Sequence, residues 1–192
     1  MKISFAKSDE LRVALAPYTT FVDLCAREGD ITWVSALRRP AFVTLLIGTV
    51  VTIAATGRVT LPSVALTAAA WSFAVLLQIG IGISMIGLAG TRRTSIARAL
   101  DLWFAGHLPW SAWLLLAMAS IRLFPLPLEP LLFTMLVPMA WTAVICSAFF
   151  RAVLGTAAGA ARLWSAAHQA ITLTLLLSFI AWSAGGWFRL AG

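Results

Sequence analysis

Residues 63–90 read SVALTAAAWSFAVLLQIGIGISMIGLAG and contain no charged side chain. A helix of about 20 apolar residues crosses the roughly 30 Å hydrocarbon core of a bilayer, and this run is about 28 residues long. It therefore predicts a membrane-spanning helix that tilts, bends or protrudes from the lipid. The remainder of the chain repeats the same pattern, so this stretch decides the fold class.

The composition of the whole chain agrees with that stretch. Of its 192 residues, 61% are hydrophobic and 11% are charged, whereas a soluble domain is about half apolar and about a quarter charged. The net charge is +7, but the basic residues lie in short clusters between apolar runs and form no continuous basic face. We therefore expect the lipid bilayer as a partner and no binding of nucleic acid.

Further apolar runs lie on both sides of residues 63–90. They predict an all-α, polytopic membrane bundle over residues 41–192, with about five transmembrane helices. The expected spans are about 41–57, 63–90, 97–121, 130–150 and 163–188. Pro138 lies inside the fourth span and predicts a kink there.

Residues 1–40 form the one extended polar region and predict a cytoplasmic or interfacial amphipathic segment. Asp30 is the expected N-cap of a helix that ends at the basic pair Arg38 and Arg39. The residues that share one apolar face of this helix are Trp33, Val34 and Leu37. Two interpretations stay open, since such a face suits either the membrane interface or packing on the protein's own loops.

The distribution of basic residues predicts the orientation. Of the 14 Lys and Arg, all but Arg58, Arg122 and Arg189 fall on the side of the N-terminus if five spans are drawn. Positive residues stay on the cytoplasmic side, so the N-terminus is expected inside and the C-terminus outside. The Ala-rich, high-pI composition and short connectors suggest the plasma (inner) membrane of a bacterium.

Small residues gather in the second half of residues 63–90. Gly80, Ser84 and Gly87 share one helical face, and in lipid such faces let helix backbones approach closely. We interpret this face as a helix-packing surface, for a partner protein in a membrane complex or for a second copy. A substrate path along the glycines is the alternative.

Asp101 is the clearest charge within an expected span. Arg98 lies three residues before it, which places both on one helix face. One interpretation is a paired charge near a helix N-terminus, where an anion is favoured. The other is a proton or ion site, because intramembrane charges often mark function.

Three further residues mark polar positions in the apolar spans. Gln78 lies in mid-span and is expected to hydrogen-bond to a neighbouring helix. His107 lies two residues before Pro109, which frees a backbone carbonyl one turn earlier. His107 could therefore cap that group, bind a lipid head group or titrate in a proton path.

A haem held between His107 and His168 is a third possibility for the histidines. Ligation by both rings needs nearly equal depth in the membrane, and the expected spans place them a turn or more apart. Cys25 and Cys146 are too few and too far apart for a thiolate metal site. Enzyme motifs are also absent from the sequence, so we expect no catalytic residue, no metal and no cofactor.

Two local segments are similar to a known family. Leu37-Arg38-Arg39-Pro40 resembles the start of the membrane domain in the Yip family of membrane proteins, bacterial members included. Leu102-Trp103-Phe104-Ala105-Gly106-His107-Leu108-Pro109 resembles that family's third span. The resemblance covers residues 37 to 188 and implies a non-enzymatic, five-span membrane protein. The longer acidic N-terminal motif of the eukaryotic members is not evident.

Three functions are compatible with these features. The first is a non-enzymatic scaffold or accessory subunit that binds membrane proteins or lipids. The second is a small transporter or permease subunit whose cavity would be lined by Gln78, His107, Pro109 and Pro138. The third is a haem-binding redox subunit.

Overall fold

The structure is a computed structural model that describes residues 8–27, 31–90, 93–124 and 133–190, with side chains described to residue 178. Every secondary-structure element in these residues is a helix, and 85% of the described residues are helical. The all-α class is therefore confirmed. The helices are α1 (Asp9–Leu15), α2 (Pro17–Ala26), α3 (Trp33–Ala36), α4 (Arg38–Thr56), α5 (Leu61–Ala89), α6 (Ile96–Ala105), α7 (Leu108–Leu123), α9 (Leu136–Ala152) and α10 (Ala158–Leu190).

Three helical stretches are long and apolar enough to cross a membrane, namely Trp33–Thr56, Leu61–Ala89 and Ile96–Leu123. The first combines α3 with α4, and the third combines α6 with α7. Helix α9 is apolar but shorter, at 17 residues, and α10 runs for 33 residues. The helices of a membrane protein are thus present, whereas the number of five spans and the orientation stay predictions.

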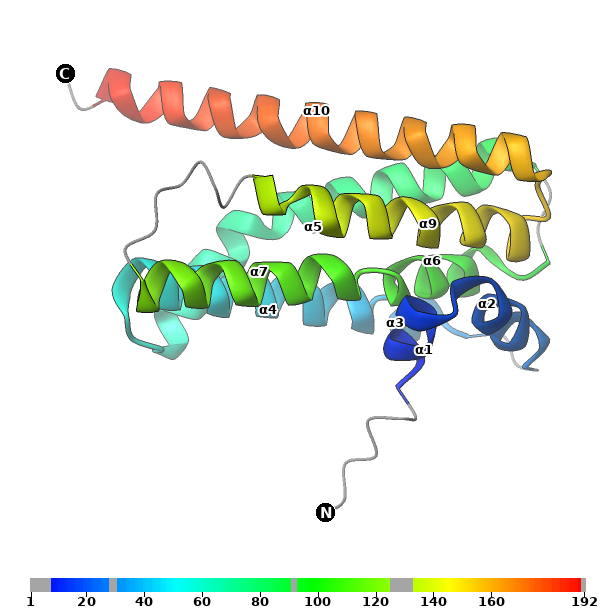
Figure 1. The fold of residues 1–192 in the computed structure, drawn as a ribbon. Coiled ribbons are helices and arrows are strands. Elements are labelled where there is room, and N and C mark those ends of the chain that lie inside the picture. The colour runs from blue at the N-terminus through cyan, green and yellow to red at the C-terminus, as the bar shows by residue number, and fades with distance from the viewer. Residues whose placement is uncertain (1–7, 28–30, 91–92, 125–132, 191–192) are drawn as a thin grey trace, which may run out of the picture.

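The long helices lie side by side in a bundle (Figure 1). Helix α10 packs along α9, α4 packs against both α5 and α7, and α7 also contacts α9. The short helices α1, α2 and α3 gather at one end of the bundle, beside α6. This arrangement places the N-terminal segment against the ends of the membrane helices.

Helices α4 and α5 form a tight antiparallel pair. Gly57 ends α4 with a left-handed φ of 68°, a conformation that glycine adopts without strain. Between the helices, a Cβ built on Gly48 would lie 2.6 Å from the Cβ of Ala68. Small residues let the two backbones approach this closely in lipid. Gly48 is therefore a helix-packing glycine that our sequence analysis missed.

The N-terminal segment packs on its own protein through α1 and α2. Ser8 caps α1, and Pro17 stands in the first turn of α2. Val13, Phe21 and Leu24 are fully buried in the same core as residues of the bundle. The Phe21 ring meets Phe149 of α9 edge-on, with 5.6 Å between the ring centroids. These two helices are therefore part of one packed structure with the bundle.

The predicted apolar face at α3 is exposed, whereas α2 contributes buried apolar residues to the core. Trp33, Val34 and Leu37 are 51%, 74% and 42% exposed. These three side chains therefore do not pack on the protein as α1 and α2 do, and their place at the membrane interface stays a prediction. The N-cap at the start of α3 is Thr32, whose hydroxyl accepts from the Ser35 N–H, whereas Asp30 lies outside the described residues.

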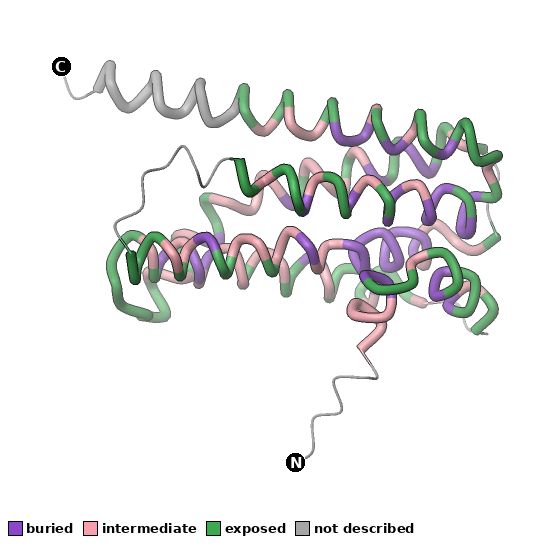
Figure 2. The backbone as a smooth tube through the Cα atoms, viewed as in Figure 1, coloured by how far each residue is buried: buried purple, intermediate pink, exposed green. Residues whose placement is uncertain are grey.

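The densest part of the core lies at the end of the bundle where the short helices gather, as the purple segments in Figure 2 show. It is built from inner positions of α6, α9 and the start of α10, joined by α2. Trp103 stands at its centre, with its ring edge-on to both Phe149 and Phe150 at 5.1 and 5.9 Å. The opposite end of the bundle is mostly exposed or half-buried along the described residues.

The observed helices differ from the predicted ones in three details. The span predicted at 97–121 is broken at Gly106 and His107, because α7 starts afresh with Pro109 in its first turn. Pro138 lies in the first turn of α9, where proline costs no helical hydrogen bond, so it does not kink the middle of a span. The last helix begins at Ala158, five residues before the predicted start of its span at 163.

Candidate functional site

A cavity with both polar and apolar residues in its lining lies between the helices of the bundle, next to the dense core. Its volume is about 140 Å³, and residues of α2, α4, α5, α6, α7, α9 and α10 contribute to its walls. One water molecule takes about 30 Å³ of liquid, so the space suits several waters or a small polar solute. The polar residues of its lining are Gln78, Trp103, His107, Thr142, Cys146, His168, Gln169 and Thr172.

Gln78 and His168 are joined across this cavity. His168 Nε2 lies 3.1 Å from Gln78 Oε1, and Gln78 Nε2 donates to Thr172 Oγ1 at 3.2 Å. The prediction that Gln78 bonds to a neighbouring helix is therefore confirmed, and the helix is α10. A carbonyl oxygen only accepts, so Nε2 of a neutral His168 ring carries the proton. Its Nδ1 then accepts from the Cys146 thiol, whose sulfur is 3.6 Å away.

Four polar atoms of the lining residues are buried without a hydrogen-bond partner among the described residues. They are Trp103 Nε1, His107 Nδ1, Thr142 Oγ1 and Gln169 Nε2. An unsatisfied buried donor or acceptor costs about 1–3 kcal/mol, and native structures hold few of them. These four atoms belong to residues of one cavity wall, on α6, on the break before α7, on α9 and on α10.

His107 and His168 line this same cavity, so the two residues lie closer together than the predicted spans imply. His107 lies eleven residues after Ile96, where α6 begins, and His168 lies ten residues after Ala158, where α10 begins. At 1.5 Å per residue both positions are roughly 15 Å from the starts of these helices. The predicted separation was counted from residue 163, and the depth of either ring in a membrane stays a prediction.

The cavity does not fit a haem between the two histidines. Both ring nitrogens of His168 already have partners, Gln78 and Cys146. The ring of His107 is stacked on Phe104, with 4.6 Å between centroids. The space of about 140 Å³ is also smaller than the roughly 300 Å³ at which ligand pockets usually begin. Among the described residues, no group of three metal-ligating side chains comes together.

The two prolines that were expected in this cavity lie elsewhere. Pro109 and Pro138 line a separate groove of about 340 Å³ between α7 and α9. The structure thus brings together Gln78 and His107 of the predicted set and His168, which the sequence suggested only as a haem ligand. It adds Thr142 and Trp103, which the helical period alone could not reveal, because the two lie on different helices.

The small-residue face of α5 is open among the residues that the structure describes. Gly80 and Ser84 line a groove of about 520 Å³ between α5 and α10. A Cβ built on Gly80 or Gly87 would meet nothing within 4 Å. No described helix of the chain packs closely on this face, so its role in helix packing stays a prediction about another molecule.

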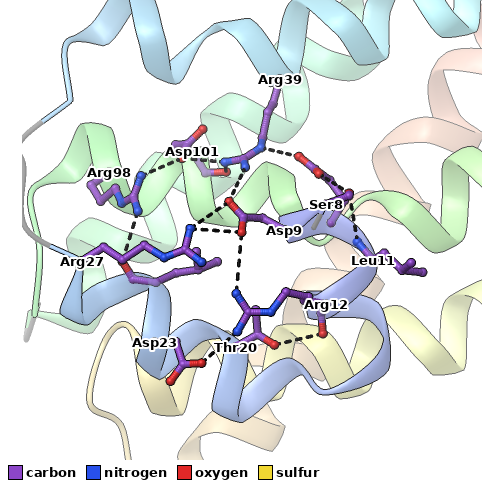
Figure 3. Close-up of polar contacts among 12 residues, drawn as sticks. Ser8, Asp9, Leu11, Arg12, Thr20, Asp23, Arg27, Arg39, Arg98 and Asp101 are labelled. Atoms are coloured by element: carbon purple, nitrogen blue, oxygen red, sulfur yellow. Dashed lines mark hydrogen bonds and ion pairs between the residues drawn. The ribbon is translucent and has the colours of Figure 1, made fainter. Parts of the chain in front are cut away.

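A second site, of charged groups, ties the N-terminal segment to the bundle (Figure 3). The Asp101 carboxylate is 3.4 Å from Arg98 Nη1, which confirms the predicted pair. Its closer partner is Arg39, whose Nη1 lies 2.6 Å from the same oxygen. Two guanidinium groups on one buried carboxylate support the interpretation of Asp101 as a structural paired charge.

Arg39 also contacts two acidic residues of α1. Arg39 Nε donates to Glu10 at 2.8 Å, and Arg39 Nη2 lies 3.7 Å from Asp9. Arg98 donates to the carbonyl of Leu24 at the end of α2, at 3.1 Å. Arg39 was predicted as an interfacial residue, but it is largely covered by these contacts, whereas Arg38 and Trp33 are exposed.

Two titratable groups of the N-terminal segment have shifted pKa values. Burial acts to raise the pKa of Glu10, but its hydrogen bonds with Ser8, its own backbone and Arg39 outweigh burial and lower it. Burial raises the pKa of the Cys25 thiol, against the opposing charges of Arg98 and Arg93. At neutral pH, Glu10 is therefore an anion held by Arg39, and Cys25 is a protonated thiol.

Comparison with protein-family models, curated proteins and solved structures finds no match for this chain. The class of protein therefore rests on its own residues, and these define an all-helical chain with helices suited to a membrane. Membership of the Yip family stays a prediction from the two segments of similar sequence.

Proposed function

We propose that this chain is a non-enzymatic membrane protein that binds a small polar solute in the cavity around Gln78, His107 and His168, as a transporter or permease subunit does. The observation that carries the proposal is the set of four polar atoms, on Trp103, His107, Thr142 and Gln169, that have no hydrogen-bond partner among the described residues and belong to the lining of that cavity. A purely structural core would lower its free energy by pairing these atoms or by replacing them with apolar groups.

The hydrogen bond between two lining residues is one that a bound solute would replace. Gln78 on α5 and His168 on α10 hold each other by one hydrogen bond, so the two helices are coupled at the cavity wall. A solute with donors and acceptors would compete for these groups and would satisfy the free ones. The break between α6 and α7, next to His107, places an irregular backbone where it borders a cavity, as transporter helices do.

Flux through proteoliposomes tests this function. Urea, ammonia and protons are small enough for the cavity, and stopped-flow light scattering or a trapped pH dye follows each. We expect at least one to cross faster than through protein-free vesicles, and to slow in Gln78→Ala and His107→Ala. Thr49→Ala on α4, outside the cavity lining, is the matched control. Identical rates in all vesicles for all three solutes would exclude the permease.

A second candidate function, the scaffold or accessory subunit, has support from α5. Gly48 is tightly packed against Ala68, whereas Gly80 and Gly87 meet nothing. The open glycines thus leave room for a transmembrane helix of a partner protein or a second copy. Gly80→Leu would weaken co-purification of such a partner from mild detergent, while a strictly monomeric, partner-free wild type would count against this function.

We also propose the topology of the protein and the membrane in which it lies. Five spans, a cytoplasmic N-terminus, an outer C-terminus and a bacterial plasma (inner) membrane are the arrangement that best suits the basic clusters. The redox function loses its support, because the histidine rings and the cavity do not fit a haem.

A further inference from the structure

A basic groove opens on the bundle where the turn between α1 and α2 meets α9 and α10. Its volume is about 670 Å³, and it is open rather than enclosed. The arginines of its wall are Arg151 and Arg162, and its hydroxyl-bearing residues are Tyr18, Thr19, Ser147 and Ser165. The remaining lining residues are small and apolar. The groove therefore combines cationic, polar and apolar walls.

The positive charge of this groove has no counterpart within the described protein. No carboxylate of the described residues is part of its lining. The described carboxylates, Asp9, Glu10, Asp23 and Asp101, are all committed elsewhere, to Arg12, Arg27, Arg39 and Arg98. Arg151 and Arg162 consequently form no ion pair in the part of the chain that the structure describes. An external anion is the natural partner of two such guanidinium groups.

Arg151 is held in position by an aromatic ring of the N-terminal segment. Its guanidinium carbon lies 4.7 Å from the centroid of Tyr18, a cation–π distance. Ser165 donates to the carbonyl of Ala143 and so fixes α10 against α9 at the groove floor. The groove is thus built by three separate elements of the fold and does not depend on one mobile side chain.

The groove changes from basic to apolar along its length. Arg151 lies in the last turn of α9 and Arg162 lies near the start of α10, so both arginines stand at the same end of the bundle. Val144, Ala148 and Ala166 line the part that is further from these helix ends. A molecule with an anionic head and a hydrocarbon tail matches this order, because its head would meet the basic walls and its tail the apolar walls.

We propose that this groove binds an anionic phospholipid. The phosphate would lie between Arg151 and Arg162. The part of an acyl chain that is nearest the head group would lie along Val144, Ala148 and Ala166. Basic pockets between membrane helices at the cytoplasmic side bind such head groups. This site is separate from the cavity around His168, so it stands or falls independently of the proposed transport.

Titration of fluorescent phosphatidylglycerol into the full-length protein in neutral detergent tests the proposal. Each arginine near a membrane surface strengthens binding by roughly fivefold, so Arg151→Gln/Arg162→Gln should weaken it roughly 25-fold. The matched control is Arg38→Gln/Arg93→Gln, which removes equal charge from exposed arginines outside the groove. We expect the control to change the dissociation constant less than about threefold.

Two further ligands identify the source of the anion. Phosphatidylcholine should bind wild type and the groove variant equally, and glycerol 3-phosphate should not displace the labelled lipid. Equal losses in the groove variant and the control would overturn the proposal, because binding would then follow net charge alone. Displacement by glycerol 3-phosphate would overturn it in favour of a soluble anion. Size-exclusion chromatography confirms that each variant remains folded.

Discussion

Arg39 and Asp101 are 62 residues apart in the sequence, yet Arg39 Nη1 lies 2.6 Å from Asp101 Oδ2. The pair joins the start of α4 to α6, and Arg39 extends the link to Glu10 of α1 (Figure 3). One guanidinium thus connects the N-terminal segment to two helices of the membrane bundle.

Removing the charge of Asp101 should loosen this connection. Asp101→Asn leaves Arg39 and Arg98 without their shared carboxylate, and we expect a loss of about 1–3 kcal/mol in unfolding free energy. Glu10 still pairs with Arg39, which keeps the loss below that of a fully isolated charge. Reversible unfolding in mixed micelles measures it.

Asp23→Asn is the matched control for that substitution. The Asp23 side chain is 59% exposed and pairs with Arg12, so its loss should cost less than about 1 kcal/mol. If the two variants proved equally stable, the link through Asp101 would be of no structural importance.

The lowered pKa of Glu10 predicts a pH dependence of stability. A carboxyl whose pKa is lower in the folded protein than its ordinary value of 4.5 stabilises the fold above that value. This stability is lost as the pH falls through the folded pKa. The melting temperature should therefore drop on acidification, and Glu10→Gln should start lower at neutral pH and drop less. A parallel decline in wild type and variant would contradict this assignment.

The two kinds of glycine predict opposite responses to a larger side chain. Gly48→Leu would force α4 away from Ala68 and should cost about 1–3 kcal/mol, the usual range for overpacking. At Gly80 an added Cβ meets no described atom within 4 Å, so Gly80→Leu should leave the stability of the monomer unchanged. Thermal unfolding of both variants in detergent tests this prediction. Comparable losses of stability in the two variants would indicate that the small-residue face of α5 is covered.

The predicted orientation is tested by reporters at the C-terminus. An outer C-terminus makes a fused alkaline phosphatase active and a fused green fluorescent protein dark in a bacterial host, because each reporter matures on one side only. The opposite result, with a fluorescent C-terminal fusion, would require an even number of spans or an inverted protein.

Much of the fold was predictable because apolar runs report helices directly. The limits of α5, Leu61–Ala89, lie within two residues of the predicted span at 63–90. The pairing of Arg98 with Asp101 was also predictable, since residues three apart share a helix face. Periodicity within one helix was sufficient for both predictions.

The contacts between helices were not predictable in the same way. Arg39 meets Asp101, and His168 meets Gln78, only after distant segments pack together. That His107 and His168 line one cavity depends on where α10 begins, and the Ala- and Gly-rich connector at residues 151–162 gives no sharp start signal. The break before α7 did have a local signal, because Pro109 two residues after His107 favours a new helix start.

Thr142→Val tests the central claim, that the polar groups of the cavity serve a bound solute. The Thr142 hydroxyl is buried and unpartnered, and valine has a similar shape without it. If the hydroxyl serves a solute, the variant should be as stable as the wild type or more stable, yet carry the transported solute more slowly in proteoliposomes. A less stable variant with unchanged flux would instead make Thr142 part of an ordinary core and would contradict the claim.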